Sequence, residues 1–72
     1  MVNINKLRGK IVECGTNISE LALKIGIDRA TLYRRFNSNG KEFTIEEADL
    51  IAKELNLSCS EASAIFFSQY VA

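Results

Sequence analysis

The sequence predicts an all-α fold of five short helices, of which the second and third form a helix-turn-helix. Apolar residues recur at spacings of three and four along most of the 72 residues, as they do on the buried stripe of an amphipathic helix. Proline is absent, and polar residues that favour helix starts precede several of these segments. No segment shows the alternation of a β-strand. The length predicts a single domain over residues 1–72.

The first helix is expected from about Asn5 to Cys14. Leu7, Ile11 and Cys14 recur at helical spacing, so they would share the buried face of this helix. Gly15 follows directly and is suited to end it. The segment therefore reads as a short amphipathic helix.

Residues 18–36 hold the helix pair. Leu21 and Ile25 lie i, i+4 on the first helix of the pair, and Leu32 and Phe36 repeat that spacing on the second. Each pair would face the core from its own helix. The position before Phe36 is charged, so we expect Phe36 to take the buried role at this end of the helix.

Steric requirements explain the residue type at each position of the turn between the two helices. Gly26 can adopt the left-handed conformation that ends the first helix. Ile27 would then fill the corner, and Asp28 is a good N-cap for the second helix. Ala22 is small where the second helix must pass close to the first. Together these residues specify a tight helix pair.

The remaining helix starts are marked by a cap residue three positions before Glu. These pairs are Asn17 with Glu20, Thr44 with Glu47, and Ser58 with Glu61. Residues 37–40 are polar and turn-forming, so they would connect the third and fourth helices. The fourth helix is expected to bury one apolar stripe, made of Ile45, Ala48, Ile51, Ala52 and Leu55.

The order of Leu21, Ala22, Gly26, Ile27 and Leu32 resembles the helix-turn-helix of the phage repressor and Cro superfamily. The resemblance covers most of the chain, to about residue 60. It implies a compact repressor-like fold, in which the third helix enters the major groove of DNA.

Composition argues against an enzyme and against a metal or cofactor site. Histidine is absent, and no nucleophile–base pair, carboxylate dyad or phosphate-binding loop is visible. Cys14 and Cys59 lack the spacing of a zinc or redox motif and lie in apolar contexts, so we expect both to be small core residues. No small-molecule ligand is indicated. No membrane span or secretion leader is visible either, which predicts a cytoplasmic protein.

Charge is balanced overall but segregated along the chain. Nine basic and nine acidic residues give a net charge of zero, whereas a small protein that binds duplex DNA is usually basic. Residues 24–41 carry a net charge of +4, and residues 42–72 carry −5. This layout permits a DNA-binding face, and it equally suits docking onto a basic protein surface.

For DNA reading, the candidates lie on the side of the third helix that faces away from its apolar residues. Arg29 and Arg34 would bind guanine edges, and Thr31 would meet a thymine methyl group. Tyr33 and Arg35 would reach phosphate. Asn17 and Ser19 stand where members of the resembled superfamily contact phosphate. The complete candidate set is Asn17, Ser19, Arg29, Thr31, Tyr33, Arg34 and Arg35. The alternative is that these are ordinary solvated helix residues.

A second candidate surface lies toward the C-terminus. Phe66 and Phe67 are adjacent, about 100° apart on a helix, so one narrow stripe cannot hold both. One aromatic side would then be exposed as a contact surface, unless the helix folds back on the first helix and buries both. Acidic residues of the fourth helix would oppose basic groups of a partner, or they form a solvated face. The candidate protein-contact set is Phe66, Phe67 and Tyr70, with Glu47 and Glu54.

The motif of residues 18–36 and the segment 61–72 also resemble the small lytic-side switch proteins of temperate phages of lactococcal type. Among these, they are most similar to antirepressors of the modulator-of-repression kind. This resemblance implies a bacterial host and a regulator of the lysis–lysogeny switch, which binds the amino-terminal domain of the phage repressor and blocks its operator contact. The alternative is a Cro-like repressor that binds a two-fold operator through its third helix. In a third possibility, the protein and the repressor occupy the DNA together.

Overall fold

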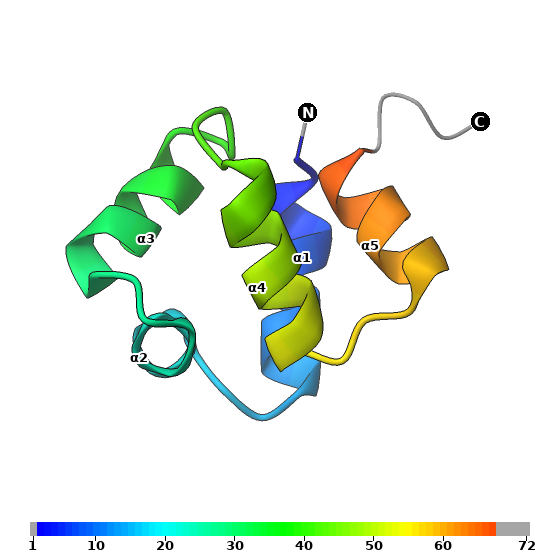
Figure 1. Ribbon diagram of the computed structural model, residues 1–72, viewed down its shortest axis with the longest axis horizontal. Helices are drawn as coiled ribbons and strands as arrows, with labels where there is room; N and C mark the ends of the chain where they lie inside the picture. The colour runs from blue at the N-terminus through cyan, green and yellow to red at the C-terminus, as the bar shows by residue number, and fades with distance from the viewer. Residues whose placement is uncertain (1, 68–72) are drawn as a thin grey trace.

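Five helices follow one another in the computed structural model, which describes residues 2–67 (Figure 1). They are α1 (Ile4–Glu13), α2 (Ile18–Ile25), α3 (Arg29–Asn37), α4 (Ile45–Glu54) and α5 (Cys59–Phe66). No strand is present within residues 2–67. The all-α helix-turn-helix fold predicted from the sequence is therefore confirmed.

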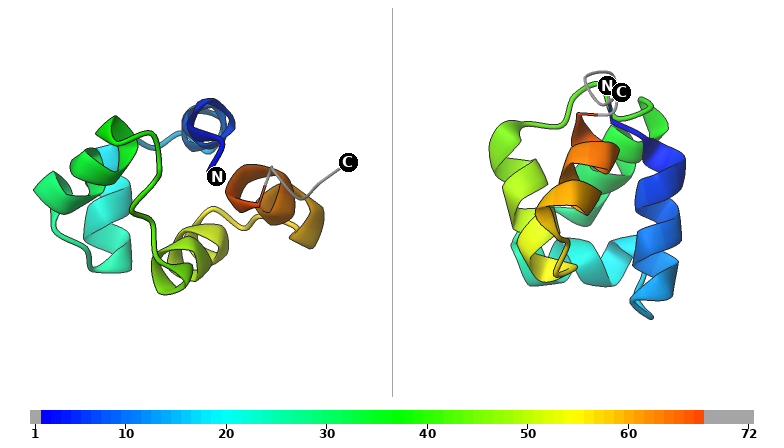
Figure 2. Two further views of the ribbon diagram at one scale, coloured as in Figure 1. Left: turned by 90° about the horizontal axis from the view of Figure 1, so that it is seen from above. Right: turned by 90° about the vertical axis from the view of Figure 1, so that its right-hand side faces the viewer.

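The core lies where all five helices face inward. Leu7 of α1, Leu21 of α2, Leu32 of α3 and Ile51 of α4 are completely buried. α5 adds Ile65 and Phe66, and no polar or charged residue of the described chain is buried. α2 packs against both α3 and α4, whereas α5 packs against α1. Figure 2 shows α1 and α5 side by side in its left view.

Side-chain caps begin every helix. Asn17 Oδ1 accepts a hydrogen bond from the amide of Glu20 at 2.9 Å, as the sequence predicts. Thr44 with Glu47 and Ser58 with Glu61 form reciprocal capping boxes, which satisfy amide donors at the helix start.

The turn between α2 and α3 has the backbone conformation at Gly26 and the N-cap at Asp28 that the sequence predicts. Gly26 ends α2 with φ of 75°, in the left-handed region, where an L side chain would be strained. The amide of Ile27 donates to the carbonyl of Ala22 at 3.0 Å. Asp28 caps α3 by accepting from the amide of Thr31 at 3.3 Å. These bonds fix the direction in which α3 leaves α2.

Two sequence-based expectations about burial are wrong. Ile45 is 81% exposed, although its spacing placed it on the buried stripe of α4. The partly buried ring of Phe43 packs against the core at this end of the helix, at 5.7 Å from the Phe36 ring and 6.1 Å from the Phe66 ring. Cys14 and Cys59 are exposed as well, because Cys14 follows the last residue of α1 and Cys59 is the first residue of α5.

α5 is held on α1 by polar contacts at both ends. The amide of Asn3 donates to the carbonyl of Ile65, and Lys10 Nζ donates to a carboxylate oxygen of Glu61. The hydrogen bond from Lys10 lowers the pKa of Glu61 from 4.5 to about 2. The charged form of Glu61 therefore stabilises the folded state, and this contribution is lost as the pH falls from 4.5 toward about 2.

Replacing Glu61 by Gln should lower the thermal midpoint at neutral pH, because Gln keeps the capping box but cannot pair with Lys10. The difference from the wild type should disappear as the pH approaches 2. Thermal unfolding followed by circular dichroism across this range measures it. Glu13→Gln is the comparison, since Glu13 contacts Lys10 from a more exposed position and should have the smaller effect. A constant difference at all pH values would exclude the ion pair as the cause.

Candidate nucleic-acid interface

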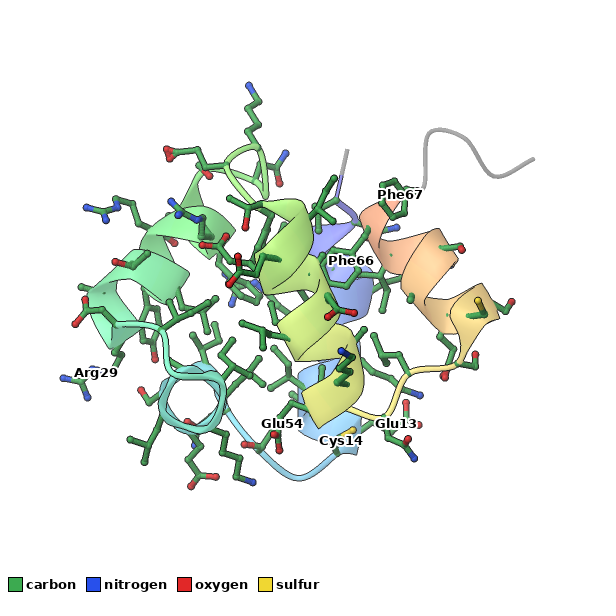
Figure 3. All side chains as sticks on the ribbon, viewed as in Figure 1. Glu13, Cys14, Arg29, Glu54, Phe66 and Phe67 are labelled. Carbon is green, nitrogen blue, oxygen red and sulfur yellow. The ribbon has the colours of Figure 1, made fainter. Side chains whose placement is uncertain are left out.

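α3 presents a polar face on the side opposite its buried residues. Leu32 is completely buried and Phe36 is 3% exposed, whereas Arg29, Tyr33 and Arg34 are exposed. The side chain of Arg29 points away from the body of the molecule (Figure 3). Arg34 therefore lies opposite the buried residues, whereas Arg29 shares the face of Leu32 and is exposed at the first position of the helix.

The start of α2 adjoins this face. Ser19 Oγ and Tyr33 Oη lie 3.3 Å apart and form a hydrogen bond between α2 and α3. Asn17, the N-cap of α2, and Tyr33 line the same shallow groove, of about 260 Å³. The fold thus brings together three candidate residues that lie up to 16 positions apart in the sequence.

Arg34 and Thr31 contact each other on α3. Arg34 Nη2 donates to Thr31 Oγ1 at 3.3 Å. Arg34 stays exposed, and Thr31 is half-buried. Because one guanidinium has five N–H donors, this bond leaves Arg34 with donors for another acceptor.

Arg35 is paired within the fold, unlike Arg29 and Arg34, so the predicted phosphate contact does not fit its position. Its Nε and Nη2 each donate to a carboxylate oxygen of Glu47 at 3.0 Å. The two side chains are only 19% and 14% exposed. This hydrogen-bonded pairing lowers the pKa of Glu47 and raises that of Arg35. Because the two side chains bind each other, Arg35 is removed from the candidate DNA-contact residues and Glu47 from the candidate protein-contact residues.

A helix-turn-helix family model matches residues 6–61. The chain belongs to this family. It is of the Cro and phage repressor type, so the protein is a DNA-binding transcription regulator. No match was found among curated proteins or among solved structures.

In this helix-turn-helix protein, the predicted aromatic contact surface is smaller than the sequence suggests. Phe66 is 6% exposed and packs in the core, so its place in that surface is a further correction. Phe67 is 49% exposed at the end of α5 (Figure 3). Glu54 is exposed and lies 4.0 Å from Lys24 Nζ. Tyr70 lies outside the described residues.

Leu23 is a surface residue that the sequence analysis missed. It is 82% exposed and lines a shallow groove of about 400 Å³ together with Ala22, Ile27 and Arg29. The signal was present in the sequence. Once Leu21, Ala22 and Ile25 occupy the inner side of α2, helical geometry leaves Leu23 outside.

Two kinds of site are not found within residues 2–67. No group of three or more acidic, Cys or His side chains there has the arrangement of a metal site. None of the five helices is long and apolar enough to cross a bilayer.

Replacing Glu47 by Gln should lower the thermal midpoint, because Arg35 would lose its charged partner while the Thr44 capping box keeps an acceptor. Glu46→Gln is the matched control. Glu46 is exposed in the same helical turn, and no ion pair to it occurs within residues 2–67. Thermal unfolding of both variants at neutral pH compares them. Equal midpoints would mean that the Arg35–Glu47 pair does not hold α3 on α4.

Proposed function

We propose that this regulator reads operator DNA with the outer face of α3. The observation that carries the proposal is the exposure of Arg34 on the side of α3 opposite Leu32 and Phe36, together with the exposure of Arg29 at the first position of the helix. Guanidinium groups recognise the O6 and N7 atoms of guanine through two parallel hydrogen bonds. Both side chains keep donors for such a contact.

The neighbouring residues supply phosphate contacts in this proposal. Asn17 and Ser19 stand at the start of α2, where amide groups and the helix dipole favour an anion. The hydroxyl of Tyr33 is hydrogen-bonded to Ser19, so we expect both residues to contact the same DNA strand. Thr31 would meet a thymine methyl group between the two arginines. Because these neighbours are uncharged, we expect few phosphates to be neutralised and a modest salt dependence.

Replacing Arg29 or Arg34 by Ala should reduce affinity for a selected operator by about 1–3 kcal/mol and relax the base preference at one position. A site selected from random duplexes serves as the probe, and mobility shifts measure binding. Lys53→Ala is the control, because Lys53 is an exposed cation that pairs with Asp49 on α4. If the arginine variants and the control bind alike, α3 does not read the bases.

A second function, antirepression, is supported by the exposed apolar groups at the other end of the molecule. Phe67 and Ile45 both reach solvent there, and exposed aromatic residues are frequent anchors of protein interfaces. In this proposal the regulator binds the DNA-binding domain of a phage repressor and prevents operator contact. Glu54 ends α4 at the far side from Ile45 and Phe67 (Figure 3), so it would face a cation of the repressor only in a contact that spans the length of α4. In a third form of the proposal, the regulator, the repressor and DNA form a ternary complex, and Arg29 and Arg34 contact DNA only within that complex.

Under antirepression, Phe67→Ala should weaken repressor binding by about 1–3 kcal/mol without changing the helical fold. The measurement is release of a labelled operator from its repressor as the regulator is added. Val12→Ala is the control, since Val12 is an exposed apolar residue on α1. Unchanged potency of the Phe67 variant would remove this residue from the contact.

A further inference from the structure

The connection between α3 and α4 contains an Asn-Gly pair in which both residues have left-handed backbone conformations. Asn39 has φ of 64° and Gly40 has φ of 78°. Glycine, and after it asparagine, tolerates this region best. A side-chain carbon added at Gly40 would lie 2.6 Å from Cβ of Val2, so only glycine fits at this position. The fold therefore requires Gly40 and favours Asn before it.

An asparagine followed by glycine is prone to spontaneous deamidation, because glycine has no side chain to hinder the reaction. The backbone nitrogen of the glycine loses its proton and forms a bond to the side-chain amide carbon of the asparagine. The bond from that carbon to the amide nitrogen breaks, and the nitrogen leaves as ammonia. Water then opens the cyclic succinimide to aspartate or isoaspartate. Water is the only co-reactant, and nothing is oxidised or reduced.

Two contacts oppose this attack in the folded protein. The Gly40 amide donates a hydrogen bond to the carbonyl of Arg35 at 3.0 Å, and this bond must break before the nitrogen can attack. Gly40 is buried beside Val2, whereas Asn39 is exposed. Figures 1 and 2 place the start of α1 at the same end of the molecule as the α3–α4 connection. The attacking nitrogen is thus bonded and covered, while water reaches the group that it attacks.

We propose that Asn39 is a site of spontaneous deamidation and that Val2 controls the rate by covering Gly40. The reaction proceeds in the fraction of molecules in which Val2 has moved away and the bond from Gly40 to Arg35 is open. The proposal does not depend on which ligand α3 binds, because the reaction is measured on the protein alone.

The product should hold the end of α3 less firmly. α3 ends at Asn37, two residues before Asn39, and a new carboxylate near the C-terminus of a helix opposes the helix dipole. Isoaspartate also lengthens the main chain next to Gly40, where Val2 leaves no room for a further atom. We therefore expect the modified protein to unfold at a lower temperature than the unmodified protein.

Peptide mass spectrometry of the full chain, after incubation in neutral buffer, measures the conversion of amide to acid. Asn56 is the matched internal control. It is exposed with φ of 54°, and the amide after it donates to the carbonyl of Ala52 at 2.9 Å, but that amide belongs to Leu57. Conversion should therefore be at least tenfold faster at Asn39 than at Asn56. Asn39→Gly keeps the left-handed backbone and should abolish it.

Val2→Ala tests the control of the rate. It should speed conversion at Asn39 about tenfold, toward the rate in guanidinium chloride, because two methyl groups that cover Gly40 are removed. Ile25→Ala is the control, since Ile25 is also partly buried against the core but belongs to α2. Thermal unfolding followed by circular dichroism shows that this control loses at least as much stability, and its rate should stay near that of the wild type.

Four results would each overturn the proposal. They are equal rates in the folded and the unfolded wild type, equal rates at Asn39 and Asn56, no conversion in the folded Val2→Ala chain, and a rate in Ile25→Ala that matches Val2→Ala.

Discussion

Leu32 and Phe36 project from one side of α3 into the core, and their burial decides which side chains the helix presents to solvent. Leu32 and Leu21 are completely buried where α3 packs against α2, and the left-handed Gly26 ends α2 before the turn into α3. Since a helix is rigid about its axis, holding these two residues inward turns Arg34 outward. The chemistry available to a ligand at α3 follows from this packing.

The arrangement of charge depends on the same packing. Arg35 lies on the flank of α3 that faces α4, where Glu47 meets it with both carboxylate oxygens. The charges of Arg35 and Glu47 are thereby neutralised within the fold and are not available to a partner. Arg29 and Arg34 of α3 and the carboxylates of Glu42 and Glu46 stay exposed. The exposed carboxylates at the start of α4 would suit a repressor with a basic recognition face.

Local rules predicted the parts of the fold that depend on neighbours in sequence. The N-caps of α2 to α5 and Gly26 have conformations that adjacent residues determine, so the sequence alone located them. The N-cap of α1, Asn3, was not predicted. The Arg35–Glu47 pair and the burial of Phe66 depend on how α3, α4 and α5 pack, and no local pattern specified that packing. Ile45 shows the limit most clearly, because it has helical spacing and is nevertheless exposed, while the partly buried ring of Phe43 packs against Phe36 and Phe66. The exposure of Arg34 was predictable, because a helix that buries Leu32 and Phe36 turns the opposite side to solvent.

The central claim is that α3, rather than the Ile45 and Phe67 end, contacts DNA. The most direct measurement is a titration of the isotope-labelled protein with a selected operator duplex, followed by amide chemical shifts. The account predicts shifts concentrated at Asn17, Ser19 and α3, with little change around Ile45 and Phe67. Shifts concentrated at Ile45 and Phe67, with α3 unaffected, would contradict it.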